Sequence, residues 1–87
     1  MILENKINVK HKKTGNDYAI TGFSKNCTNS QSEQILVLYE SLTTFKDIHF
    51  SREVGEFIKK FECPDLKPLI NEFEKILSEY NNTKDPL

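Results

Sequence analysis

The stretch INVKHKKTGNDYAITGF, residues 7–23, carries the clearest strand and turn signals for the start of the fold. On either side of residues 14–17, apolar and polar residues alternate, as they do in a β-strand that turns one face toward a core. The intervening Thr-Gly-Asn-Asp is typical of a turn, because glycine and asparagine tolerate positive backbone φ and aspartate hydrogen-bonds to nearby backbone amides. The stretch therefore predicts a β-hairpin with strands over residues 7–13 and 18–23.

Two more strands are expected after the hairpin. Residues 24–33 are polar and predict a connection that is long for a compact domain, and long connections often carry function. Residues 34–40 include five consecutive apolar residues and predict a strand that is covered on both faces. A short strand is expected over residues 48–50.

The spacing of apolar residues changes after this strand and predicts helix. A short helical turn is expected near residues 52–60, with Ser51 as its N-cap. The residues that carry the helical spacing are Val54, Phe57, Ile58 and Phe61.

A longer amphipathic helix is predicted over residues 65–81. Pro64 interrupts the chain before it, Asp65 is a suitable N-cap, and Pro68 falls in the first turn, where its missing N–H costs little. Asn81-Asn82 is expected to end it. Its apolar stripe consists of Leu66, Leu69, Ile70, Phe73, Ile76, Leu77 and Tyr80.

These elements predict one domain over residues 1–87 that is mainly β. The fold class expected from the element order is a small antiparallel sheet or partial barrel, over residues 7–62, plus one C-terminal amphipathic α-helix. A chain of 87 residues buries only a small core, so the helix is expected either to cover the sheet or to pair with a second copy.

Composition excludes several classes of protein. The formal net charge is −1, and no apolar run is long enough to span a membrane. The first residues lack the apolar segment of a signal peptide, so a cytoplasmic location is expected, with Cys27 and Cys63 as thiols. The spacing of the cysteines and of the two histidines matches no zinc motif, and neither a metal nor another cofactor is expected.

Four motifs in order resemble the bacterial and phage DUF1653 family. Residues 9–22 are similar to its opening Y-x-H-x-K-x-G-x-x-Y-x-V-x-G, and residues 26–29 to a polar segment containing H/N-x-x-T. Residues 36–39 are similar to its L-V-V-Y strand, and residues 50–57 to its closing W/F-V-R-x-x-x-x-F. The resemblance covers residues 7–62 and implies a small SH3-like antiparallel barrel. The chain departs from the family in lacking the aromatic residue before His11 and in adding the C-terminal helix.

Arg52 is the strongest candidate for a binding residue. It is the only arginine in the chain, the family motif also has an arginine at this place, and a guanidinium matches carboxylate and phosphate groups. The alternative is a structural arginine paired with Glu40, Glu53 or Glu56. If the barrel forms a cleft beside Arg52, the other expected ligand-binding residues are His11, Tyr18, Thr28, Asn29 and Tyr39, although each tyrosine taken alone is better explained as a core residue.

Charge is distributed unevenly along the chain. Residues 1–30 carry five basic and two acidic residues, and residues 31–87 carry seven basic and eleven acidic residues. A basic hairpin could attract phosphate, but nucleic-acid modules are usually more basic overall and interleave stacking aromatic residues, which disfavours that partner. No catalytic motif occurs, so an enzyme is not expected.

The stripe of the C-terminal helix has two interpretations that can hold together. One is packing on the sheet of the same chain. The other is a homodimer in which two helices pair along a heptad-like seam. The seam would consist of Leu66, Leu69, Phe73, Ile76 and Tyr80.

Two classes of function stay open at this point. The first is a non-enzymatic module that sequesters a small anionic, nucleotide-like ligand, in the manner of small phage-type inhibitors that act against host defence. This interpretation rests on analogy with small phage-type proteins of similar size that lack catalytic motifs, and not on a physical argument. The second is an adaptor whose barrel or helix binds a host protein, with nucleic acid as the less favoured partner and no membrane contact.

Overall fold

The computed structural model of the protein describes residues 1–26, 34–43 and 48–83. Five strands and two helices occur in this part of the chain. In order they are β1 (Ile2–His11), β2 (Asp17–Lys25), β3 (Ile35–Ser41), β4 (His49–Glu53), α1 (Val54–Lys60), β5 (Phe61–Glu62) and α2 (Lys67–Thr83).

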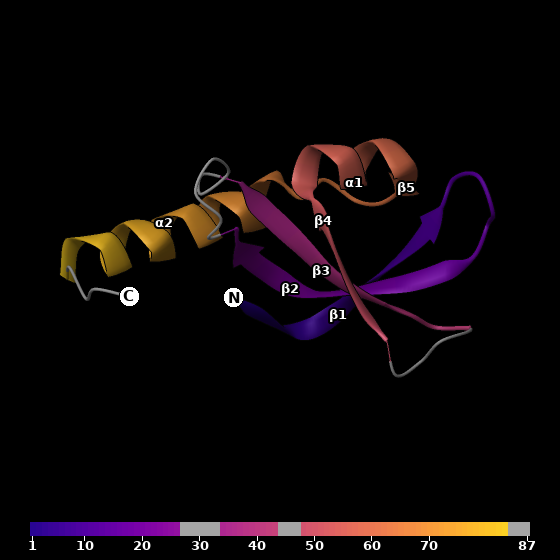
Figure 1. The fold of residues 1–87 in the computed structure, drawn as a ribbon, viewed down its shortest axis with the longest axis horizontal. Coiled ribbons are helices and arrows are strands. Elements are labelled where there is room, and N and C mark those ends of the chain that lie inside the picture. Colours follow the sequence, from indigo (N-terminus) through magenta and orange to yellow (C-terminus); the bar gives the residue numbers. More distant parts are fainter. Residues whose placement is uncertain (27–33, 44–47, 84–87) are drawn as a thin grey trace.

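The strands form one antiparallel sheet in the order β4-β3-β2-β1-β5. The sheet curls into a half-barrel, and both helices lie on the same side of it (Figure 1). The prediction of a mainly β domain with a C-terminal helix is therefore confirmed. The barrel is not closed, since β4 pairs with β3 and β5 pairs with β1.

The predicted hairpin is present as β1 and β2. Gly15 has a φ of 74°, a left-handed conformation that glycine adopts without steric cost, and its N–H donates to the His11 carbonyl at 2.8 Å. Both strands are longer than predicted. β1 begins at Ile2, and its register with β2 shifts between Ile2 and Ile7. This irregularity interrupts the apolar–polar alternation, and the first part of β1 was not predicted for that reason.

The core lies between the curled sheet and the helices. Its buried side chains come from β1, β2, β3, β5 and both helices, and the half-buried Phe50 of β4 packs against them. On β3 only one face is buried, because Val37, Tyr39 and Ser41 are buried while Leu36 and Leu38 are half-exposed. The prediction that this strand is covered on both faces is wrong, since both helices lie on one side of the sheet.

The helical turn after β4 is α1, but its cap differs from the prediction. The carboxylate of Glu53, not the hydroxyl of Ser51, accepts hydrogen bonds from the first backbone amides of the helix, at 2.9 and 3.1 Å. Ser51 instead lies within β4. Phe61 has helical spacing in the sequence, yet it belongs to β5, where it pairs with His11.

The C-terminal helix α2 is present close to its predicted bounds. The Asp65 carboxylate accepts a hydrogen bond from the Lys67 amide at 3.0 Å, and Pro68 lies in the first turn as predicted. Phe73 stacks on Phe23 of β2 with ring centroids 6.3 Å apart. No helix in the described part of the chain is both long enough and apolar enough to cross a membrane.

Candidate functional site

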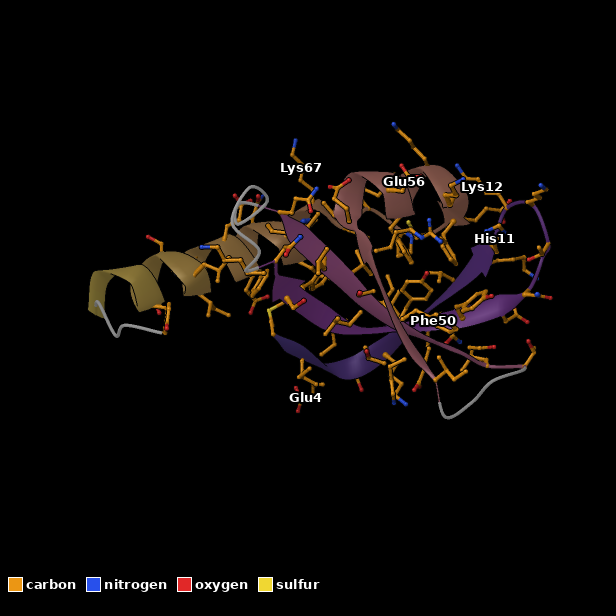
Figure 2. The ribbon with its side chains drawn as sticks, viewed as in Figure 1. Glu4, His11, Lys12, Phe50, Glu56 and Lys67 are labelled. Atoms are coloured by element: carbon orange, nitrogen blue, oxygen red, sulfur yellow. The ribbon has the colours of Figure 1, made fainter. Side chains whose placement is uncertain are left out.

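Six rings pack together on the core side of the sheet, and we call them the aromatic cluster. Tyr39 lies at its centre, with ring centroids 5.1 to 5.7 Å from those of four neighbours. Figure 2 labels His11 and Phe50, which lie toward the end of the sheet away from α2. The cluster consists of His11, Tyr18, Tyr39, Phe50, Phe57 and Phe61.

Arg52 lies on β4 beside this cluster. In the β3–β4 ladder Arg52 is opposite Val37 and Phe50 is opposite Tyr39, so all four side chains are on the core side of the sheet. The half-buried Arg52 donates a hydrogen bond from Nε to the hydroxyl of Tyr39 at 3.4 Å. The site thus joins a cation on the edge strand to the aromatic cluster.

Arg52 forms no ion pair with any carboxylate in the described part of the chain. Glu40 is paired with Lys6 at 2.6 Å. Glu53 caps α1, and Glu56 pairs with a lysine one helical turn away at 4.0 Å. The interpretation of Arg52 as a structural partner of one of these glutamates is therefore wrong, because all three are engaged elsewhere.

The other predicted site residues differ in burial and in the part of the fold where they lie. Tyr39 is 4% exposed and belongs to the core, while Tyr18 is half-buried at the rim of the cluster. His11 Nδ1 accepts hydrogen bonds from two backbone amides of the hairpin turn, at 3.2 and 3.3 Å, which gives the ring a structural role. Thr28 and Asn29 lie outside the described residues.

The cleft expected beside Arg52 stays a prediction, because Thr28 and Asn29, which would form part of it, lie outside the described residues. Tyr18 packs directly against Tyr39, and the rings of His11, Tyr18 and Tyr39 all pack against Phe61, which stacks on Phe57 with centroids 4.2 Å apart. Tyr18 and Phe50 are half-buried at the rim of the cluster, and Phe50 lies two residues from Arg52 on β4. Phe50 was not among the predicted site residues. Its spacing of two residues from Arg52 on one strand was a signal that both lie on the same face of the sheet.

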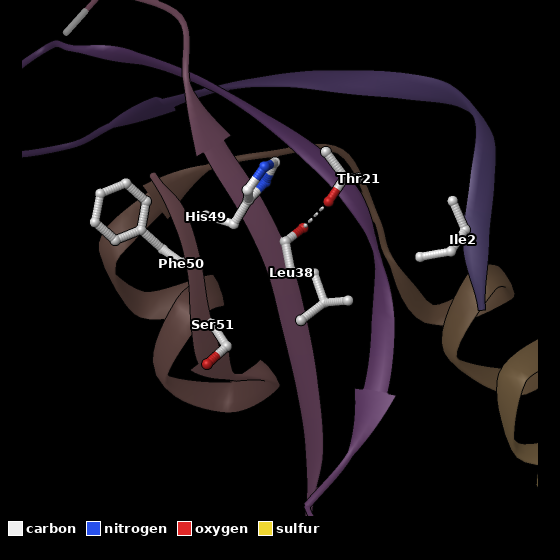
Figure 3. Close-up of a pocket in the computed structure, with 6 residues that line it drawn as sticks. All are labelled: Ile2, Thr21, Leu38, His49, Phe50 and Ser51. Atoms are coloured by element: carbon white, nitrogen blue, oxygen red, sulfur yellow. Dashed lines mark hydrogen bonds between the residues drawn. The ribbon is translucent and has the colours of Figure 1, made fainter. Parts of the chain in front are cut away.

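A second feature lies on the outer face of the sheet, which the helices do not cover (Figure 3). It is an open hollow of about 460 Å³, which we call the outer hollow, and the Thr21 hydroxyl donates to the Leu38 carbonyl within it at 3.3 Å. Its lining is formed by Ile2, Thr21, Leu38, His49, Phe50 and Ser51. No sequence signal identified this hollow, because it depends on which side of the sheet the helices occupy.

A charged group borders the outer hollow. The hydrogen bond from Lys6 Nζ is the main cause that lowers the pKa of Glu40 from its ordinary value; the charge of Lys6 adds to this effect, and burial opposes it. His49 Nδ1 is 3.9 Å from the second carboxylate oxygen of Glu40. Glu40 is therefore ionised at neutral pH and supplies a fixed negative charge on the outer face.

Cys63 is a free, half-buried thiol. Burial raises the pKa of Cys63 above its ordinary value, an effect that the charge of Lys12 opposes. A thiol with a raised pKa is a weak nucleophile at neutral pH. Among the described residues, no group of three or more side chains could hold a metal ion.

The relation of the chain to known proteins was tested by comparison of sequence and of structure. No family model, no curated protein and no solved structure matches the chain. The resemblance of residues 7–62 to the DUF1653 family therefore stays a prediction.

Proposed function

We propose that the protein is a small, non-enzymatic binding module that holds an anionic group of its ligand at Arg52. The observation that supports this proposal most strongly is the half-buried guanidinium of Arg52, which has the Tyr39 hydroxyl as a partner and no carboxylate in the described part of the chain. Partial removal of a charge from water is unfavourable unless a partner compensates for it. An anionic ligand would supply that partner.

The geometry of the guanidinium suits phosphate or carboxylate. Arginine has five N–H donors, and the hydrogen bond to Tyr39 uses only the one on Nε. The four N–H groups on the two Nη atoms stay available for two parallel hydrogen bonds to an oxyanion. The bond to Tyr39 also restricts the side chain before the ligand arrives, which lowers the entropy cost of binding.

The rim of the aromatic cluster favours a ligand with a planar group next to its anionic group. Tyr18 and Phe50 are half-buried there, so part of each ring stays accessible, and Phe50 lies two residues from Arg52 on β4. Aromatic rings stack on nucleobases irrespective of sequence. The proposed ligand is therefore a nucleotide-like anion, which the protein sequesters without changing it.

A thermal-shift panel tests this proposal. Adenosine and guanosine mono-, di- and triphosphates are compared with their nucleosides, for the unmodified protein and for Arg52→Ala, Arg52→Lys and Lys59→Ala. Lys59 is an exposed lysine on α1 and serves as the matched control for loss of a positive charge. We expect a phosphate-bearing ligand to raise the melting temperature of the unmodified and Lys59→Ala proteins. Arg52→Ala should abolish the rise, and Arg52→Lys should weaken it.

Two outcomes of this panel contradict the proposal. One is an equal shift in Arg52→Ala, which would place the anion at another residue. The other is the absence of any shift with all the nucleotides. Retardation of DNA that weakens steeply with added salt would point instead to nucleic acid as the partner.

The outer hollow favours a second candidate function, that of a protein–protein adaptor. The hollow is mainly apolar, and Ile2 at its margin is 76% exposed. Exposed apolar surface of this kind is common at protein interfaces. A binding partner that is recovered by pull-down with the unmodified protein and lost with Ile2→Lys would favour the adaptor.

A further inference from the structure

Strand β4 is an open edge of the sheet. It pairs with β3 on one side, and no backbone group of His49–Glu53 forms a further hydrogen bond with another strand or loop in the described part of the chain. An edge strand presents a row of N–H and C=O groups that can pair with another strand. The side chains of β4 therefore decide which strand can be accepted there.

The sequence of β4, His-Phe-Ser-Arg-Glu, is complementary to itself. When two antiparallel copies are aligned with Ser51 opposite Ser51, Phe50 lies opposite Arg52 and His49 lies opposite Glu53. The first of these pairs places a guanidinium beside an aromatic ring, and the second places an imidazole beside a carboxylate. Each pair occurs twice, because the arrangement has a two-fold axis through Ser51.

We propose that a second copy of this chain pairs antiparallel with β4 in this register and joins the two half-barrel sheets into one. The core-side residues Phe50 and Arg52 of one copy then continue the core side of the other copy. This proposal goes beyond the proposed function, because it assigns a partner to the backbone edge of β4, although its side-chain contacts include the Arg52 guanidinium and the Phe50 ring. It also differs from the dimer expected along the C-terminal helix. Two residues of that expected seam, Leu66 and Phe73, are buried within the chain.

Each pair has a physical basis in the hydrogen-bonding and stacking capacity that these side chains keep in the single chain. Arg52 has no carboxylate partner in the described part of the chain, so its guanidinium can lie against the ring of Phe50 in the second copy. His49 is mostly exposed, and its imidazole can donate a hydrogen bond to Glu53 of the second copy. Glu53 can accept this bond while it caps α1, since a carboxylate has about four acceptor positions and two are used there.

Other registers are less favourable than the one through Ser51. A shift by two residues in one direction places Arg52 opposite Arg52, and like charges directly opposite are destabilising. A shift in the other direction places Arg52 opposite the apolar Ile48. In the proposed register the two Arg52 residues are diagonal neighbours, with backbones roughly 7–8 Å apart, and this is a smaller repulsion. The Arg52–Phe50 and His49–Glu53 pairs, together with the separation of the two Arg52 charges, thus favour this register between two copies.

The proposed pairing also covers exposed apolar surface. Ile48 is 46% exposed immediately before β4, and in this register it lies near the start of α1 of the second copy. His49 and Ser51 line the outer hollow, so the side chains of the second copy extend one wall of it. Burial of these groups adds a hydrophobic contribution to the backbone hydrogen bonds.

A cysteine on the two-fold axis tests the proposal directly. In a full-length background with Cys27→Ser and Cys63→Ser, Ser51→Cys places two thiols opposite each other, within reach of a disulfide. Ser78→Cys, at an exposed position on α2, is the matched control. Under mild oxidation we expect Ser51→Cys to form a covalent dimer at least about tenfold faster than Ser78→Cys, because pairing raises the effective thiol concentration.

The mass of the chain with its native cysteines in solution supplies a second readout that needs no cross-link. Analytical ultracentrifugation under reducing conditions should show a mass that rises with concentration from 10.1 kDa toward twice that value. Ser51→Asp places two negative charges across the axis and should keep the chain monomeric, whereas Ser78→Asp should leave the dimer intact. A monomer at all concentrations, equal cross-linking of the two cysteine variants, or a dimer that survives Ser51→Asp would each overturn the proposal.

Discussion

Tyr39 connects the core of the protein to its candidate binding residue. Its ring is 4% exposed and packs against four other rings, while its hydroxyl accepts the hydrogen bond from Arg52. A phenol can do both because it has an apolar body and a polar tip. The position of the guanidinium therefore depends on the packing of the aromatic cluster.

Phe57 and Ile58 are neighbours on α1 with opposite environments. Phe57 is 0% exposed and stacks on Phe61, whereas Ile58 is 45% exposed. We expect Phe57→Ala to lower the free energy of unfolding by about 3–5 kcal/mol. Ile58→Ala should cost less than about 1 kcal/mol, as expected for a surface position. Urea denaturation of both variants measures the difference, and equal losses would show that Phe57 is not part of the core.

The ion pair between Lys6 and Glu40 predicts a pH dependence of stability. The hydrogen bond from Lys6 is the main cause of the lowered pKa of Glu40, whose ordinary value is 4.5. The ionised carboxylate therefore stabilises the folded state above that pH, and this stabilisation is lost as the pH falls through the lowered pKa. Lys6→Ala should be less stable than the unmodified protein at pH 7, and the difference should shrink below pH 4.5. A difference that is independent of pH would contradict this role for the pair.

Elements with a strong local period were predictable from the sequence, and elements decided by distant contacts were not. The hairpin and α2 follow from alternation and from the helical stripe. β5 was missed because Phe61 continues the helical spacing of α1, while its pairing with His11, fifty residues away in the chain, determines its conformation. The N-cap of α1 was missed for a similar reason, because β4 extends through Ser51 to Glu53.

The stripe of α2 divides into buried and exposed positions. Leu66, which immediately precedes α2, and Phe73 are 1% and 4% exposed, whereas Ile76 is 44% exposed. We expect Phe73→Ala to lower the free energy of unfolding by about 3–5 kcal/mol, because its ring stacks on Phe23. Ile76→Ala should change it by less than about 1 kcal/mol. Thermal or chemical unfolding of the two variants checks this, and a large loss for Ile76→Ala would indicate that α2 is covered by another chain.

The arrangement of the whole chain explains which surfaces are available. Both helices cover the same side of the half-barrel, and α2 extends past the end of the sheet, which gives a long molecule of 42 × 24 × 22 Å (Figure 1). The outer hollow and the edge of β4 follow from this arrangement. Arg52 was identified from the sequence by its residue type, but its surroundings were not, because they depend on the side of the sheet that the helices occupy.

Nuclear magnetic resonance of Arg52 tests the proposed anion site most directly. Arg52 is the only arginine in the chain, so its side-chain Nε–Hε group gives a single resonance that needs no selective labelling. We predict that this resonance shifts and saturates during titration with a nucleotide that raises the melting temperature, and that the matched nucleoside leaves it unchanged. A nucleotide that binds to the protein without moving the Arg52 resonance would contradict the account.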